Sequence, residues 1–488
     1  MNNEMLILAS LIVIPLAAAA ILVLGRRQLT RIAGWLAFAA AGLTLAATLA
    51  LLPGLNKGLE PRIELLWLPE AGIHLILHVD WITFPFLLTE AAVTVFALFY
   101  SLGYLKPNEN TPFFYALLLL FGLGMSGTTL ADSIFLFYIF WELMLIASCV
   151  LILVWGEGNN KGGVALKYFL VTHFGSLLVL VALILLYDQT GSDSFMVLRS
   201  GLALAPGAVA AITTLFLIGF GIKMAVFPLH IWLPDAHSVA PMPVTIMLAA
   251  AMLSMGVYGI LRFPFSIFSP NQMAVFSLPL MVAGLVSQVY GALMALVEKD
   301  IKRIVAYSSV SQMGYILFGL GTLTHEGIAG ATLHVIYHGV VKALLFMCVG
   351  LVIHASQTRE VSRLGGLFNK LPLVGFCSAV GVLAIAGGPM LAIFNSEWMI
   401  YSGGFHTIYS GLTIAAVLGS LLTVAYAVRL FSGIFLGEPV PDQTLSVLPA
   451  SMRLATLILA ALTFLAGLFP APVFAWIEQE LRFILGGI

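Results

Sequence analysis

The chain has 488 residues, of which 61% are hydrophobic and 9% are charged, and its mean hydropathy is +1.07. A soluble globular domain carries roughly a quarter charged residues, so this composition excludes a water-soluble protein and indicates one surrounded by lipid. The net charge of −1 and the absence of a long basic run give no indication of nucleic-acid binding. The cysteines Cys149, Cys348 and Cys377 lie far apart and lack the spacing of an Fe–S or zinc site.

Apolar runs of about 20 residues, the length that crosses a hydrocarbon core, recur along the whole chain. Glu4 rather than a basic region precedes the first run, so we expect a retained helix and not a signal peptide. The connection 53–79 is rich in Pro and Gly and is predicted to be a surface hairpin or irregular loop. We therefore predict an all-α polytopic membrane protein of about fourteen helices, at 4–24, 31–52, 80–104, 113–130, 132–155, 164–187, 207–227, 243–263, 274–297, 303–322, 328–355, 372–400, 407–436 and 453–477.

Lysine and arginine are distributed unevenly between the two sets of connections. The odd-numbered connections hold most of them, for example Arg26, Lys106, Lys302 and Arg359, whereas the even-numbered connections hold few. Cytoplasmic loops of membrane proteins carry the excess of basic residues. The sequence therefore predicts that both termini lie on the outer side of a cell membrane.

Two of the predicted helices are interrupted. Pro228 breaks the seventh, because proline lacks an N–H and clashes with the preceding turn, and Gly387, Gly388 and Pro389 interrupt the twelfth. Interrupted helices at matching positions are typical of transporters built from internal repeats. We therefore divide the chain into N-terminal helices 1–104, a five-helix repeat 105–265, a second five-helix repeat 266–436, and a final helix in 437–488.

Ionisable residues inside the predicted helices form the candidate site. Such groups are costly in lipid and usually mark an ion pathway. His334, His338 and Lys342 recur every four residues, so they line one helix face. A buried Glu–Lys pair can change charge state at small cost, and histidine titrates near neutral pH, so the set fits proton transfer. The candidate proton pathway comprises Glu142, Lys223, His230, His334, His338, Lys342 and Glu397.

Each of these residues also has a structural alternative. Glu142 and Lys223 could form an ion pair that only holds helices together, and His230 or His237 could cap a helix end. His173 could be a packed core histidine. Glu90 and Asp132 lie nearer helix ends or one polar face, so we leave them out of the pathway.

Four sequence motifs resemble those of a known family. They are FWELMLI around Glu142, KMAVFPLHIWLPDAHSVAP around Lys223, EKDIKRIVAYSSVSQMGY at 298–315, and HGVVKALLF with Lys342. The chain resembles the antiporter-like subunits shared by respiratory complex I, energy-converting membrane-bound hydrogenases and Mrp-type Na⁺/H⁺ antiporters. Glu397 makes it similar to the M-type subunit of complex I and to the hydrogenase-linked branch.

The resemblance implies a fold of fourteen helices with two inverted five-helix repeats. It also implies a Glu142–Lys223 pair, a central relay and an exit carboxylate, Glu397. Many relatives carry a lysine midway along the eighth helix, where this chain offers only Ser254. The break in the twelfth helix also departs from the family, because it reads Gly388-Pro-Met-Leu-Ala-Ile-Phe.

These observations predict a proton-translocating subunit of a redox-driven complex I-like or hydrogenase-like assembly. The chain contains no nucleotide motif or redox ligands, so we expect Fe–S, flavin, NiFe or quinone centres only on partner subunits. Other antiporter-like subunits are expected among the partners. The alternatives are a subunit of a Mrp-type antiporter that also moves Na⁺, a solute carrier acting alone, and a non-conducting scaffold.

Overall fold

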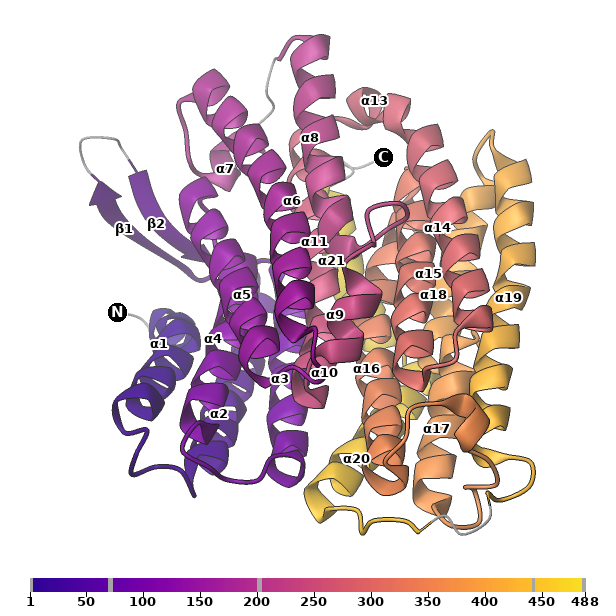
Figure 1. Ribbon diagram of the computed structural model, residues 1–488. Helices are drawn as coiled ribbons and strands as arrows, with labels where there is room; N and C mark the ends of the chain where they lie inside the picture. The colour runs from indigo at the N-terminus through magenta and orange to yellow at the C-terminus, as the bar shows by residue number, and fades with distance from the viewer. Residues whose placement is uncertain (1–2, 69–72, 200–203, 441–443, 485–488) are drawn as a thin grey trace.

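Long helices run alternately up and down through the molecule (Figure 1). The computed structural model describes residues 3–68, 73–199, 204–440 and 444–484. The N-terminal part contains α1 (Asn3–Leu24), α2 (Ala33–Leu55), β1 (Arg62–Leu68), β2 (Ile73–His78), α3 (Thr83–Tyr104), α4 (Thr111–Leu130), α5 (Ile134–Trp155), α6 (Lys161–Thr190), α7 (Phe195–Leu198), α8 (Pro206–Met224), α9 (Leu233–Val239), α10 (Met242–Met247), the π-helical segment η2 (Leu248–Met252), α11 (Leu253–Arg262) and α12 (Pro264–Ile267).

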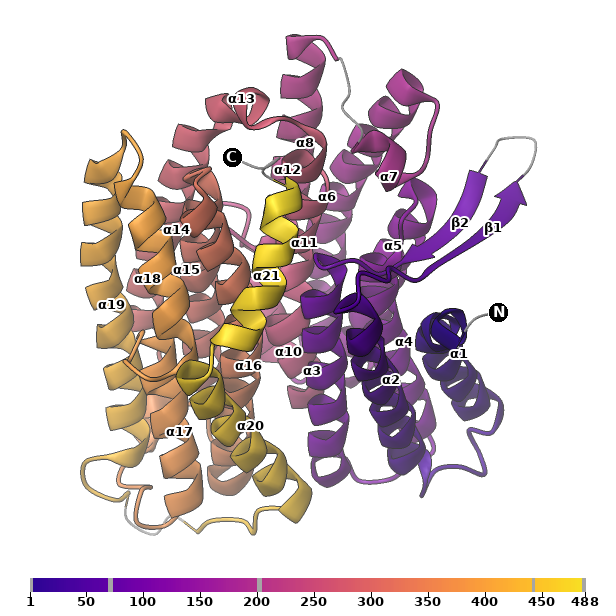
Figure 2. The ribbon, with the colours of Figure 1, turned by 180° about the vertical axis from the view of Figure 1, so that it is seen from behind.

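The C-terminal part continues the same alternation. It contains α13 (Pro270–Met273), η3 (Ala274–Phe276), α14 (Ser277–Val297), α15 (Ile301–Gly321), α16 (His325–Ser356), η4 (Val361–Arg363), α17 (Pro372–Ile385), α18 (Ala392–Phe405), α19 (Ser410–Phe435), α20 (Ala450–Leu468) and α21 (Ala471–Ile484). Figure 2 shows α21 on the side of the bundle opposite to α8 and α9.

Thirteen helices in the described part of the chain are long and apolar enough to cross a membrane. The predicted segment 372–400 is absent from that set because it is divided into α17 and α18, each of 14 residues. These thirteen helices and the divided pair account for all fourteen predicted segments. The predicted single helix 453–477 is wrong, because α20 ends at Leu468, Phe469 and Pro470 interrupt it, and α21 begins at Ala471.

Both predicted interruptions coincide with ends of helices. The helix α8 ends at Met224, Ala225 adopts a left-handed conformation with φ of 56°, and α9 begins only at Leu233. The indole N–H of Trp232 donates a 2.9 Å hydrogen bond to the carbonyl of Ile222, which satisfies one free group at the end of α8. In the second interruption, Gly387 has φ of 69°, a conformation that glycine adopts without strain.

The connection 53–79 contains the predicted hairpin, in which β1 and β2 pair in antiparallel register. Its β2 end joins the start of α5, because the backbone N–H of Asp132 donates to the carbonyl of Ile76 at 2.8 Å. Figure 1 shows the hairpin on the same end of the bundle as α7 and α13. The predicted odd-numbered connections lie at the opposite end.

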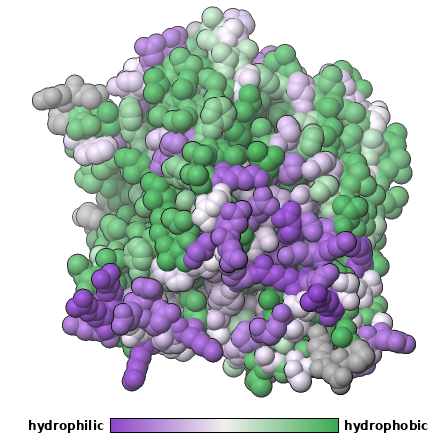
Figure 3. All heavy atoms as spheres, in the orientation of Figure 1, coloured by the Kyte–Doolittle hydropathy of each residue, from purple (hydrophilic) through white to green (hydrophobic). Residues whose placement is uncertain are grey.

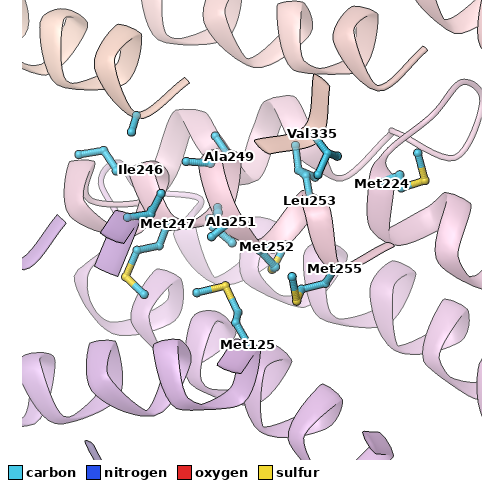
Figure 4. Packing of buried hydrophobic residues seen from close by; sticks show 14 of the residues in the cluster. Met125, Met224, Ile246, Met247, Ala249, Ala251, Met252, Leu253, Met255 and Val335 are labelled. Carbon is cyan, nitrogen blue, oxygen red and sulfur yellow. The ribbon is translucent and has the colours of Figure 1, made fainter. Parts of the chain in front are cut away.

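The core is densest around η2 and α16. Residues 242–265, which include η2, are all buried, and His334, His338 and Lys342 of α16 are at most 1% exposed. Figure 4 shows Met247, Ala251 and Met252 packed among buried apolar side chains that include Met125 of α4 and Val335 of α16. The two central elements are therefore shielded from lipid by the rest of the bundle.

The outer surface is mostly apolar, as lipid contact requires. Large exposed side chains include Leu166 at 58%, Trp398 at 69% and Leu421 at 63%. Figure 3 shows hydrophilic residues concentrated in the lower half of this face, with a patch near the middle where Figure 1 shows α9. The predicted fold class, an all-α polytopic membrane protein, is confirmed by the helices and by this surface.

Candidate functional site

Glu142 lies in the middle of α5 with a side chain that is 17% exposed. Its Oε2 lies 3.2 Å from Nδ1 of His173 on α6. The second oxygen, Oε1, is buried and makes no hydrogen bond to the described residues. An unsatisfied buried carboxylate oxygen is unfavourable without water or a proton, so this position can bind either.

Lys223 lies in the last turn of α8 and is 2% exposed. Its Nζ lies 5.1 Å from the ring centroid of Trp141 and makes no hydrogen bond to the described residues. Trp141 precedes Glu142 in the chain, and its indole N–H donates to Ser176 at 3.0 Å. The structure therefore brings Lys223 against α5 through a cation–π contact, beside the helix turn that carries Glu142.

His230 lies in the interruption between α8 and α9 and is 5% exposed. Its ring centroid lies 4.9 Å from that of Tyr290 and 5.7 Å from that of Phe227. The Nδ1 atom is buried and has no hydrogen-bond partner among the described residues. His237 of α9 is also buried, and its ring stacks on Phe346 with centroids 5.2 Å apart.

Charged residues fix α9 to its neighbours. Asp235 accepts hydrogen bonds from Lys167 of α6 and from Arg303 of α15, both at 2.8 Å. Burial acts to raise the pKa of Asp235, but these two cationic donors outweigh it and hold the pKa below its ordinary value. Asp235 is therefore ionised near neutral pH and holds the interrupted helix between α6 and α15.

Lys302 departs from its predicted place in a cytoplasmic connection. It is 1% exposed, in the first turn of α15. Its Nζ donates to the carbonyl of Ala240 at 2.5 Å and to that of Ser238 at 3.4 Å, at the C-terminal end of α9. A cation at the last carbonyls of a helix is a favourable cap, so the buried charge has a structural reason.

His334, His338 and Lys342 line one side of α16, as their spacing predicts. The ring of His334 makes two hydrogen bonds, one between Nε2 and Gln312 Oε1 at 2.9 Å and one between Nδ1 and Ser396 Oγ at 3.1 Å. The Nζ atom of Lys342 contacts Ser308 Oγ and donates to the carbonyl of Val305 at 3.1 Å. His338 Nε2 is buried without a hydrogen-bond partner among the described residues.

Glu397 lies in the second turn of α18 and is 8% exposed. It directly follows Ser396, the residue that bonds to His334. Its carboxylate packs against Gly387 in the helix interruption, where an added Cβ would overlap Oε2. The structure therefore brings His334 of α16 into contact with Ser396, the residue next to Glu397 on α18.

The continuous helix formed by η2 and α11 contacts both α8 and α16. A Cβ at Gly256 of α11 would lie 2.6 Å from the carbonyl of Phe220 on α8, and one at Gly339 of α16 would lie 2.7 Å from the carbonyl of Ala250 in η2. Figure 4 shows Met224, Leu253 and Val335 on this path. Apolar side chains thus lie between Lys223 and the α16 residues His334, His338 and Lys342. The π-helical turn in this region is of a kind that is frequent at functional sites.

Residues 131–423 match the family described as NADH:quinone oxidoreductase/Mrp antiporter, transmembrane. The chain belongs to this family. The match covers every predicted pathway residue and leaves α1 to α4, the hairpin, α20 and α21 outside it. The thirteen apolar helices of its described residues make this chain a multi-pass membrane protein.

Relatives and solved structures agree with this assignment. NADH-quinone oxidoreductase subunit M of Rhodobacter capsulatus is 32% identical over 481 residues, which cover 94% of this chain and 92% of the relative. A chain of the Mrp complex from Dietzia sp. DQ12-45-1b has a TM-score of 0.90 at 24% identity. The superposition covers 99% of this chain and 98% of that one. A chain of the membrane-bound sulfane sulfur reductase, an archaeal respiratory membrane complex, has a TM-score of 0.87 at 28% identity, with 98% of this chain and 78% of that one covered.

Several residues at the site of this family member were not singled out from the sequence. Gln312, Ser308 and Ser396 supply the partners of His334 and Lys342. Polar uncharged residues are common inside membrane helices, so type and spacing alone gave no signal. Ser254, at the place of the relatives' lysine, bonds only to the carbonyl of Ala251 and supplies no ionisable group.

Proposed function

We propose that this chain is a proton-translocating membrane subunit of a redox-driven respiratory complex. The observation that carries this proposal is the buried set Lys223, His334, His338, Lys342 and Glu397, which the bundle holds at or beside two helix interruptions. Buried ionisable groups inside a membrane are costly and are retained where ions move. Membership of a family that contains subunit M supports the same function.

Each residue of the pathway has a distinct role in this proposal. Glu142 stabilises the charged form of Lys223, and Lys223 takes up a proton from the cytoplasmic side near His230. His334, His338 and Lys342 pass protons laterally along α16. Glu397 then releases them to the outer side.

The contact between His334 and Ser396 supports transfer from α16 to α18. A neutral imidazole donates through one ring nitrogen and accepts through the other, and both nitrogens of His334 have partners. Between Lys223 and α16, the apolar packing around η2 requires water molecules to complete the pathway. Broken helices supply free backbone groups that can order such water.

The coupling partners are other subunits of a hetero-oligomeric membrane complex. Fe–S, flavin, NiFe or quinone centres belong to those partners, and the driving signal reaches this chain across a subunit interface. We place both termini on the outer side of the cell membrane, from the distribution of basic residues. Two inverted five-helix repeats, 105–265 and 266–436, account for the paired interruptions.

Measurement of protons pumped per electron in the reconstituted complex tests the proposal. Lys223→Ala should abolish most of the pumping by this subunit, because the first proton-binding group is lost. Lys57→Ala, on an exposed connection, is the matched control and should pump normally. Native stoichiometry in Lys223→Ala would reject the function.

A subunit of a Mrp-type Na⁺/H⁺ antiporter is the second candidate. It is favoured by the TM-score of 0.90 to a chain of the Mrp complex, with 99% of this chain covered. In that case an ion gradient rather than electron transfer drives the protons. Sodium-dependent proton flux in vesicles without a redox donor would identify this function.

A further inference from the structure

Glu90 is a buried carboxyl group outside the pathway described above. It occupies the eighth position of the 22-residue helix α3 and is 0% exposed. The sequence suggested a place near a helix end or a polar face, and the structure corrects this, since the side chain points into the bundle between helices. It also lies outside the part of the chain that matches the family, residues 131–423.

The hydrogen bonds around Glu90 fit a protonated side chain better than an ionised one. Its Oε1 has no partner among the described residues, and its Oε2 lies 3.4 Å from Thr129 Oγ1 of α4. The Thr129 hydroxyl has a single hydrogen, and it lies 2.9 Å from the carbonyl of Ser126. If Thr129 donates to Ser126, an ionised Glu90 is left without a donor in a buried site, which is strongly unfavourable.

A proton on Glu90 resolves this arrangement. The carboxylic acid then donates to Thr129 Oγ1, and Thr129 donates onward to Ser126, so that both hydroxyl hydrogens are used. The alternative, an ionised Glu90 stabilised by a cation, finds no basic residue in contact with it among the described residues. The side chain therefore has the surroundings of a group that holds a proton.

Hydrogen bonds to the backbone of Thr129 extend from this site towards the hairpin end of the bundle. The carbonyl of Thr129 accepts a hydrogen bond from Tyr258 of α11 at 2.8 Å and one from Thr83 of α3 at 3.2 Å. The backbone N–H of Thr83 in turn donates to Asp80 at 2.9 Å. Two O–H groups, on Tyr258 and Thr83, thus donate to one backbone carbonyl.

A buried ion cluster stands at the end of this series. Arg262 of α11 pairs with Asp80 and lies 3.4 Å from Asp132, and Asp132 lies 3.6 Å from Arg62 at the base of the hairpin. Burial acts to raise the pKa of Asp80, but Arg262, His78 and Arg199 outweigh it and lower the pKa. Burial raises the pKa of Asp132 and Arg262 counters this only partly, so the two carboxyl groups of the cluster are shifted in opposite directions.

A small cavity lies nearby, and Ala91, the residue after Glu90, is part of its lining. It measures about 20 Å³ and is lined by residues of α1 to α4 that include Thr44, Thr94 and Ser126. One water molecule needs roughly 10–15 Å³ and two or more polar partners, so this space admits one. Thr94 lies one helical turn beyond Glu90 on the same face of α3. The surroundings of Glu90 thus offer polar contacts on both sides.

We propose that Glu90 is a further proton-binding residue, which exchanges its proton through the hydroxyl of Thr129 and through water in the cavity between α1, α2, α3 and α4. It rests on the proposed function, because protons must move through this chain for the site to serve transport. It adds a proton site in the N-terminal helices, separate from Glu397 of α18. No redox step is involved, and each transfer moves one proton between oxygen atoms.

Glu90→Gln in the intact, reconstituted complex tests this proposal. The amide keeps the size of the side chain but cannot release a proton. We expect loss of most of the proton flux per electron, together with loss of a carboxylic-acid carbonyl band from the infrared difference spectrum of turnover. If Glu90 is purely structural, the Glu90→Gln variant keeps the same carboxylic-acid bands in this spectrum as the native protein. Glu109→Gln, on the exposed connection at the opposite end of the bundle, is the matched control.

Two isosteric variants and Lys223→Ala complete the design. Thr129→Val removes the hydroxyl in contact with Glu90, and Tyr258→Phe removes the hydroxyl that donates to the Thr129 carbonyl. Each should lower the flux. Native flux in Glu90→Gln, or in both hydroxyl variants if Glu90→Gln fails to assemble, overturns the role of Glu90. If Lys223→Ala lowers the flux in that experiment, the proposed function stands without Glu90. If Lys223→Ala also pumps normally, the proposed function falls as well.

Discussion

The imidazole of His334 lies 3.1 Å from the hydroxyl of Ser396, the residue that precedes Glu397. This contact joins α16, which crosses the bundle without interruption, to α18, which begins after one. The second ring nitrogen of His334 bonds to Gln312 of α15 at 2.9 Å. The orientation of the imidazole is therefore set from two helices, and its tautomer is coupled to the hydroxyl beside the proposed exit residue.

Ser396→Ala should slow proton transfer from α16 to Glu397. The substitution removes the partner of His334 Nδ1, so the ring loses one of its two fixed contacts, worth about 1 kcal/mol in stability. We expect fewer protons per electron and a small fall in thermal stability. Ser432→Ala, on α19, removes a hydroxyl that bonds to the carbonyl of Arg429 in its own helix and should leave pumping unchanged. Equal pumping by the two variants would contradict a role for the His334–Ser396 contact.

Gly387→Ala should disturb Glu397 directly. Gly387 has φ of 69°, and its added Cβ would overlap the Glu397 carboxylate. The matched control is Gly437→Ala, which has φ of 82° and nothing within 4 Å of the new Cβ. Both variants carry the left-handed backbone penalty of roughly 1–2 kcal/mol, so they should lose similar stability. Only Gly387→Ala should lose pumping, measured as proton flux in vesicles.

Gly339→Ala should displace α16 from the π-helical segment. The new Cβ would lie 2.7 Å from the carbonyl of Ala250 and 2.9 Å from Thr89, too close for either to remain in place. Because His338 is the adjacent residue, we expect lower thermal stability and reduced pumping. In Gly42→Ala on α2 the Cβ meets nothing within 4 Å, and the gain in helix propensity of roughly 0.5–1 kcal/mol should leave that variant as stable or more stable. A fully active, stable Gly339→Ala would show that this close contact is unimportant.

The attachment of α9 should depend on pH through Asp235. Lys167 and Arg303 lower its pKa in the folded protein, so the interaction stabilises the protein at pH above about 3.9, the ordinary value. The contribution is lost as pH falls through the lowered folded value. Since both partners are partly exposed, we expect Asp235→Asn to cost about 1 kcal/mol near neutral pH. Thermal unfolding of native protein and variant should differ near pH 7 and converge in acid, and a constant difference would contradict the ion pairs.

Hydropathy and helix breakers determined most of the fold. All fourteen apolar segments correspond to helices in the structure, because a hydrocarbon solvent requires every spanning backbone group to be bonded within its own helix. The interruptions after Met224 and around Gly387 follow from local residues in the same way, through proline and glycine. Buried ionisable residues could also be recognised one by one, since an apolar run makes each of them conspicuous.

Only the tertiary structure decided which of these groups meet. Lys302 appeared to belong to a basic connection, but it caps α9 through a carbonyl 62 positions away in the chain. Glu90 seemed peripheral, but the packing of α3 against α4 and α11 buries it beside Thr129. Hydropathy reports how a segment partitions into lipid and carries no information on which helix faces which. Contacts such as those of His334 with Gln312 and Ser396 depend on the rotation and pairing of helices, which arise from packing between segments that are distant in sequence.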